Sequence, residues 1–95
     1  MDESSARAAI DRAHRAKLLL GDELLSQAFA DIEDALITAW RQSTSDRAPL
    51  REDAWRSLKL LEKLKAALEK HVRDGSVAER DLLEIETKRK RFGIV

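Results

Sequence analysis

Apolar residues recur every three or four positions along almost the whole chain, which predicts amphipathic α-helices. Glycine, proline and β-branched residues, which would favour turns or strands, are few. We therefore predict an all-α fold in a single domain spanning residues 1–95. The stripes and their interruptions predict four helices, over residues 5–20, 22–43, 47–74 and 77–91.

The breaks between the predicted helices are short and carry capping signals. Gly21 is expected to end the first helix, and Asp22 to cap the second. Residues 43–49 hold the clearest loop signal, with serine, threonine, aspartate and proline together. Gly75 is expected to stop the third helix, and a Ser-x-x-Glu capping box beginning at Ser76 is expected to start the fourth.

The second and third predicted helices are joined by a short loop, which forces them to run antiparallel. Residues 22–44 carry a net charge of −4 and residues 46–74 a net charge of +2, so the two helices can pair along their exposed edges. We predict a long antiparallel helical hairpin, similar to a coiled coil, with shorter N- and C-terminal helices flanking it. The residues expected to hold the hairpin are Leu25, Phe29, Ile32, Leu36, Trp40, Leu58, Leu61, Leu64 and Leu68.

The composition supports this interpretation and narrows the function. Ala, Glu, Lys, Leu and Arg make up 55 of the 95 residues, a bias typical of long helices and coiled coils. The formal net charge is zero, so the molecule as a whole is not expected to attract nucleic acid or an anionic membrane. Cysteine is absent, which excludes disulfides, and no apolar run approaches the length of a membrane span. A cytoplasmic location is predicted.

No pattern of residues predicts catalysis, a cofactor or a metal site. His14 and His71 are far apart, and neither has partners at the spacing of a zinc site. Pairs of carboxylates lie among lysines and arginines on polar helix faces, whereas acid–base catalysis needs carboxylates in a cleft that shifts their pKa values. Three glycines are too few for a phosphate-binding loop. We predict that the protein is not an enzyme and needs no cofactor.

The apolar residues exceed what one narrow helix–helix seam can bury, which predicts binding to another copy or to a larger protein. Aromatic and large aliphatic residues away from the main stripes, and the apolar C-terminal end, are the expected contacts. The alternative is that these side chains fold back onto the same chain. The predicted interface residues are Trp55, Leu60, Leu83, Phe92, Ile94 and Val95.

Two basic patches near the chain ends leave a nucleic-acid-binding regulator as an alternative function. Against it, basic residues near a helix C-terminus commonly complement the helix dipole, and the helix predicted over residues 22–43 is too acidic to enter a DNA groove. A small inhibitor that covers one target protein would use the same apolar anchors. The residues that would contact nucleic acid are Arg7, Arg12, Arg15, Lys17, Lys88, Arg89, Lys90 and Arg91.

Several stretches between residues 16 and 83 resemble a group of small helical proteins encoded among the head and packaging genes of tailed phages and prophages. The resemblance is a spaced pattern and contains no catalytic motif. It implies a non-enzymatic virion or DNA-packaging component, located in the host cytoplasm or in the virion. The stretches that carry it are AKLLLGDELLSQAF from residue 16, AWRQST from residue 39, REDAW from residue 51 and LEKHVRDGSVA from residue 68.

Overall fold

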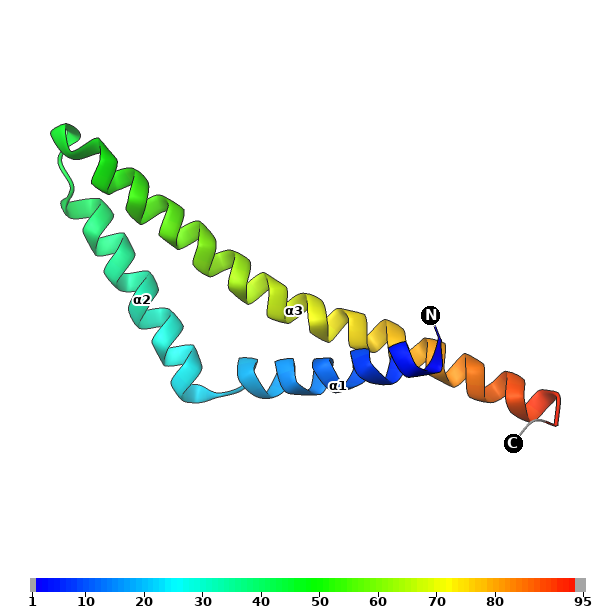
Figure 1. Cartoon of the computed structure of the whole chain (residues 1–95). Coiled ribbons are helices and arrows are strands. Elements are labelled where there is room, and N and C mark those ends of the chain that lie inside the picture. The colour runs from blue at the N-terminus through cyan, green and yellow to red at the C-terminus, as the bar shows by residue number, and fades with distance from the viewer. Residues whose placement is uncertain (1, 94–95) are drawn as a thin grey trace. The chain divides into compact units, whose positions relative to one another are not determined.

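The computed structural model describes residues 2–93, apart from the side chain of Ser45. These residues form three α-helices and one short 3-10 helix (Figure 1). Helices account for 92% of the structure and no strand occurs between residues 2 and 93, which confirms the predicted all-α class. In chain order the elements are α1 (Glu3–Leu20), α2 (Glu23–Gln42), η1 (Ser45–Arg47) and α3 (Ala48–Arg91).

The helix α3 runs without a break through the stretch where two helices were predicted, so the stop at Gly75 and the separate helix over residues 77–91 are wrong. Gly75 is buried within α3. The Ser76 hydroxyl donates to the Val72 carbonyl oxygen at 3.4 Å, as a serine inside a helix does, and caps nothing. A glycine inside a helix costs only about 1 kcal/mol relative to alanine, which the packing of α1 against this stretch offsets.

The starts of α1 and α2 follow ordinary capping chemistry. The Asp2 carboxylate accepts a hydrogen bond of 2.7 Å from the Ser5 backbone N–H, and α1 begins at Glu3, two residues before the predicted start. The Asp22 carboxylate accepts one of 2.8 Å from the Leu25 N–H, which confirms the predicted cap. Each cap satisfies a backbone donor that the first turn of a helix leaves free.

The chain divides into two compact units. Unit 1 (Met1–Leu19 and Leu68–Val95) contains α1 and the second half of α3. Unit 2 (Leu20–Ala67) contains α2, the connecting loop and the first half of α3. The single-domain organisation, and the long hairpin with flanking helices, stay predictions.

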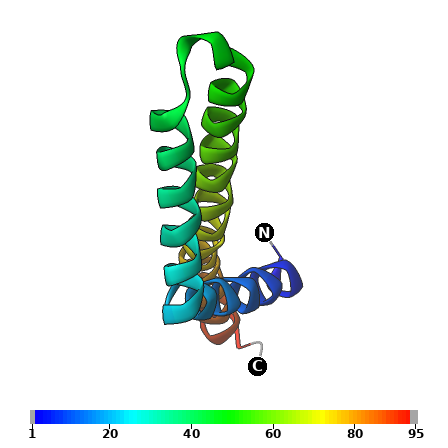
Figure 2. The ribbon, with the colours of Figure 1, turned by 90° about the vertical axis from the view of Figure 1, so that its left-hand side faces the viewer.

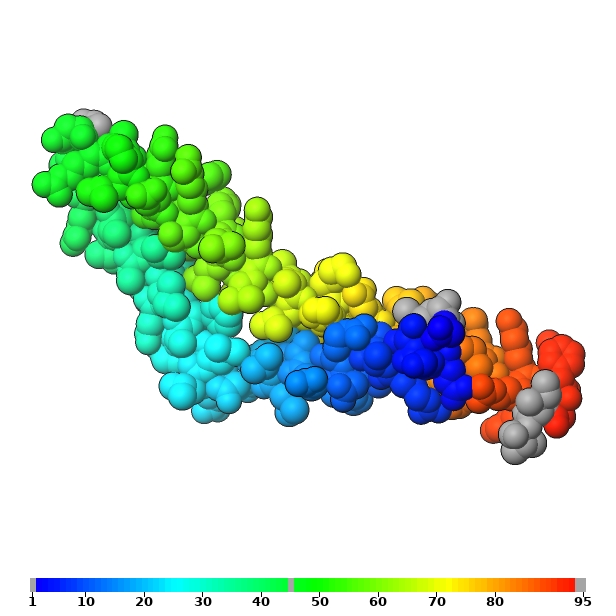
Figure 3. All heavy atoms as spheres, viewed as in Figure 1, coloured from blue at the N-terminus to red at the C-terminus, as the bar shows by residue number. Residues whose placement is uncertain are grey.

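Unit 1 is a pair of helices held at very short range by small residues. Its buried side chains are all alanines, and they recur on α1 at the spacings of three and four that predicted a helix over residues 5–20. A Cβ atom placed on Gly75 would lie 2.1 Å from the Cβ atom of Ala13, so the two backbones approach closer than any larger residue allows. Figure 3 shows the side chains of α1 lying directly on those of α3. The buried alanines are Ala6, Ala9, Ala13 and Ala16 on α1 and Ala78 on α3.

Unit 2 is built from larger side chains but encloses almost none of them. Its two helices lie side by side and run in opposite directions (Figures 1 and 2). No residue of α2 is buried, and Ala54 is the one buried residue that α3 contributes to this unit. Of the residues expected to hold the hairpin, Leu25, Phe29, Leu36, Leu58, Leu61 and Leu68 are half-buried, whereas Ile32, Trp40 and Leu64 are exposed.

Candidate functional site

The strongest candidate for a functional site is an apolar face of unit 2, built by α2 and the first half of α3 together. One shallow hollow on this face lies between Ile32 on α2 and Leu60 and Leu64 on α3. A second hollow continues it toward the loop, between Ala39 and Leu50, and the two share Leu36 and Ser57. The loop end of this second hollow is also lined by polar residues, which are Gln42, Ser43, Arg47 and Asp53. We call this surface the leucine face and define it by Ile32, Ala39, Leu50, Leu60 and Leu64.

The large apolar side chains of the leucine face are exposed to water, which is unfavourable for apolar surface. Exposed fractions are 49% for Ile32, 55% for Leu50, 68% for Leu60 and 53% for Leu64. Scattered exposed leucines are ordinary on a protein surface, but these four border adjoining hollows of one small unit. Exposed, largely apolar surfaces of this kind are typical of sites that bind another protein, a membrane or a ligand, which makes this face a candidate interface.

The aromatic side chains of unit 2 fix how its two helices are aligned. The Arg51 guanidinium carbon lies 4.9 Å from the centre of the Trp40 ring, and the Lys65 ammonium lies 5.6 Å from the centre of the Phe29 ring. Both contacts join α2 to α3, and each is worth about 0.5–1 kcal/mol at an exposed site. They align the two helices although neither buries a large side chain completely.

A separate apolar groove in unit 2 contains both tryptophans. Leu36 and Trp40 from α2 line it, with Ala54, Trp55 and Leu58 from α3. Trp55 remains 55% exposed, and the Lys59 ammonium lies 5.8 Å from the centre of its ring. Arg41 also borders this groove. It is no less apolar than the leucine face, but its volume of about 250 Å³ is smaller than the volumes of about 430 and 670 Å³ of the two hollows on that face, which makes it the weaker candidate.

The structure places the predicted interface residues in two different units. Trp55 and Leu60 belong to unit 2, where Leu60 is part of the leucine face. Leu83 and Phe92 belong to unit 1 and are 64% and 70% exposed. Ile94 and Val95 lie outside the described residues. Sequence reasoning missed Leu50 and assigned Leu64 and Ile32 to the inside of the hairpin. The positions of Leu50, Leu60 and Leu64 were the available signal, since they make α3 apolar over a wider arc than one neighbouring helix covers.

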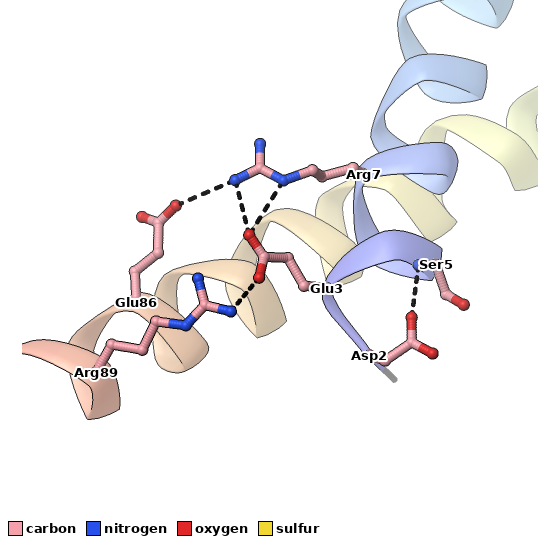
Figure 4. Close-up of polar contacts among 6 residues, drawn as sticks. All are labelled: Asp2, Glu3, Ser5, Arg7, Glu86 and Arg89. Carbon is pink, nitrogen blue, oxygen red and sulfur yellow. Dashed lines mark hydrogen bonds and ion pairs between the residues drawn. The ribbon is translucent and has the colours of Figure 1, made fainter. Parts of the chain in front are cut away.

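The basic residues that would contact nucleic acid all lie in unit 1, where carboxylates hold three of them. Figure 4 shows Glu3 between two arginines from distant parts of the chain. Its carboxylate accepts from Arg89 and lies 3.1 Å from the guanidinium of Arg7, and Arg7 also lies 3.8 Å from Glu86. Each pairing reduces the positive charge that a phosphate backbone would meet.

The remaining predicted cations lie on α1 and in the last turn of α3. Arg12 and Arg15 border a shallow hollow with His71, and Arg15 lies 3.7 Å from the carboxylate of Asp11. Lys17 is exposed on α1. The last turn of α3 is entirely basic, which suits the negative end of the helix dipole; its cations are Lys88, Arg89, Lys90 and Arg91.

Protonating Glu3 is expected to loosen the contact between the first turn of α1 and the end of α3. Hydrogen bonds from Arg89, and then from Arg7, hold the pKa of Glu3 below its ordinary value of 4.5. A lowered pKa stabilises the folded state at every pH above 4.5, and this contribution is lost as the pH falls below that value. A carbon-13 carboxyl titration by NMR should therefore give a midpoint for Glu3 below 4.5.

Two variants test the cause of this shift. Arg89→Gln should move the Glu3 midpoint upward, and by more than Arg7→Gln does, because Arg89 makes the larger contribution. A Glu3 midpoint that is the same in the wild-type chain and in Arg89→Gln would contradict the contact.

No other arrangement in the described part of the chain suggests chemistry. Between residues 2 and 93, no three histidine, cysteine, aspartate or glutamate side chains gather where a metal ion would bind. None of the helices described is long and apolar enough to cross a lipid bilayer. No protein-family model matches the chain, and no curated protein or solved structure matches it either. Function is therefore inferred from the leucine face.

Proposed function

We propose that the protein is a non-enzymatic helical assembly component that acts by associating with further copies of itself through the leucine face of unit 2. In this proposal α2 and the first half of α3 work as an antiparallel hairpin, and unit 1 flanks it. The setting that fits the sequence resemblance is a phage virion or its DNA-packaging machinery.

The observation that carries the proposal is the contrast between what the chain buries and what it leaves in water. Every buried side chain in the described core is an alanine, whereas twelve large apolar side chains are exposed. Burying a leucine side chain stabilises a protein by about 1.5–3 kcal/mol, so covering these side chains would add several kcal/mol of stability. A second copy supplies the missing cover without requiring any other molecule.

A measurement of solution mass tests the proposal directly. Light scattering over a range of protein and salt concentrations should give a discrete mass that is a whole multiple of 10.8 kDa. Burial of apolar surface is insensitive to moderate salt, so the multiple should persist as salt is raised. A chain that stays monomeric at all concentrations would overturn self-association and would favour a different protein target for the leucine face.

The nucleic-acid-binding alternative predicts a different response. Neutralising Lys88, Lys90 and Arg91 together would then abolish a salt-dependent affinity for DNA or RNA. Under the assembly proposal the same variant keeps its oligomeric mass, because these residues lie in unit 1 and not on the leucine face. Arg89 is left intact in this variant because its contact with Glu3 belongs to the fold of unit 1.

A further inference from the structure

The two edges of the leucine face carry opposite charges. On α2, Asp31 lies four residues before Ala35, and Ala35 lies four before Ala39, so all three share one side of the helix next to the face. On α3, Lys63 lies three residues after Leu60 and borders the same hollow as Leu60. Taken whole, α2 has four acidic residues and one basic residue, whereas residues 48–67 have three acidic and five basic residues.

The aromatic contacts fix which residues of these edges lie at the same level. Lys65 lies opposite Phe29, with its ammonium 5.6 Å from the ring centre. Because the two helices run in opposite directions, a step of two residues forward from Phe29 on α2 corresponds to a step of two back from Lys65 on α3 (Figure 2). By this contact Asp31 is level with Lys63, and by the contact of Arg51 with Trp40 it is level with Leu60, three residues or about 4.5 Å away on α3. The Lys63 side chain is long enough to span that difference, and Asp31 and Lys63 lie on opposite edges of the leucine face.

We propose that the leucine face binds a second copy of the chain through a twofold axis parallel to its helices, so that α2 of each copy lies on the first half of α3 of the other. This inference rests on the proposed self-association and adds its geometry. Rotation about such an axis does not shift residues along the helices, so residues at one level in the first copy lie at the same level in the second. Asp31 of one copy then faces Lys63 of the second, and the symmetry repeats the contact.

The same axis also matches the apolar residues. Ile32 lies one residue beyond Asp31, so its level falls between Leu60 and Leu64 of α3. In the paired copies Ile32 therefore enters the hollow that these two leucines border in the second chain. The product is a four-helix bundle with an apolar centre and charged pairs at its rims.

The competing twofold arrangement places like helices together. An axis perpendicular to the helices within the interface lays α2 on α2 and α3 on α3. Most charged residues of α2 are acidic, so acidic residues of the two copies would then face one another there, which destabilises an interface. On α3 the outcome depends on where the axis crosses, because Asp53 as well as Lys63 borders the face. The charge distribution of unit 2 therefore favours the parallel axis.

Two single charge reversals test the arrangement. Asp31→Lys alone sets two lysines opposite each other at both symmetry-related contacts, and Lys63→Asp alone sets two aspartates there. Each variant should self-associate about tenfold or more weakly than the wild-type chain at low salt, since attraction becomes repulsion twice. An equal mixture of the two should recover association, because the lysine that D31K introduces on one chain then meets the aspartate that K63D introduces on the other.

The outcomes separate this inference from the proposed function. Glu84→Lys and Lys88→Asp make the same charge changes in unit 1 and should leave the mass unchanged, and their mixture should show no preference for mixed pairs. Weaker association of each single variant, together with recovery when Asp31→Lys and Lys63→Asp are combined in one chain, would support the parallel axis, because an axis that pairs like helices leaves like charges facing each other in the wild-type chain and in all three variants. Native mass spectrometry on chains of different isotopic mass measures the pairing. A wild-type oligomer whose D31K and K63D variants show no preference for mixed pairs would overturn the axis alone. A monomeric wild-type chain would overturn both.

Discussion

Gly75→Ala is expected to destabilise unit 1 by about 1–3 kcal/mol, the usual cost of forcing an extra methyl group into a filled interior. The new Cβ atom would lie 2.1 Å from the Cβ atom of Ala13, and neither alanine has a rotatable side chain that could move aside. The two helices would have to separate. At an exposed helix position the same substitution stabilises a protein by up to about 1 kcal/mol. Destabilisation by Gly75→Ala would therefore show that α1 and α3 are in close contact at this residue.

Urea unfolding followed by circular dichroism, with amide exchange of α1 as a local probe, measures this effect. Both tryptophans lie in unit 2, so their fluorescence would not report on α1. The matched control is the double variant Ala13→Gly with Gly75→Ala, which moves the methyl group from one helix to the other. A double-mutant cycle should give a favourable coupling between the two substitutions. Stabilisation by Gly75→Ala alone would show that the helices are farther apart.

Leu60→Asp is expected to weaken self-association by at least about 100-fold, the largest effect on assembly of any single substitution considered. Leu60 is 68% exposed in the single chain and would be buried in the assembly. The substitution removes that burial from both copies of a twofold interface, so the loss occurs twice. The carboxylate also has to leave water or hold the two surfaces apart. Light scattering or sedimentation equilibrium over a concentration series gives the dissociation constant.

Leu83→Asp is the matched control for this experiment. It is the same substitution in the same helix at a residue that is 64% exposed, but Leu83 lies in unit 1. Helix propensity and surface polarity change alike in both variants, so only the position differs. A dissociation constant raised by Leu83→Asp and unchanged by Leu60→Asp would place the interface in unit 1 and contradict the proposed function.

Local patterns were sufficient to predict most of the helices. The alanine stripe of α1 and the Asp22 cap depend on residues a few positions apart, and the structure has both. Gly75 was misread because its role comes from Ala13, which lies about sixty residues away and becomes a neighbour only when α1 packs on α3. A glycine required by close packing and a glycine that ends a helix look the same in sequence.

The candidate site could be predicted only in part. An excess of apolar residues was visible, and Trp55 and Leu60 are exposed as expected of interface residues. Sequence alone could not tell which side of α3 would face α2, so Leu64 was assigned to the hairpin interior. The pairing of Arg89 with Glu3 was equally hidden, because these residues stand at opposite ends of the chain.

Under the assembly proposal, the absence of any buried residue in α2 links the folding of that helix to assembly. A helix with so little protection opens readily in a single copy, since most helical stability in proteins comes from packing. Under the assembly proposal, each association step adds stability that grows with the logarithm of the protein concentration. Proteases would then cleave unassembled copies first, at α2. The amount of protein that persists would therefore match the number of copies that the assembly incorporates.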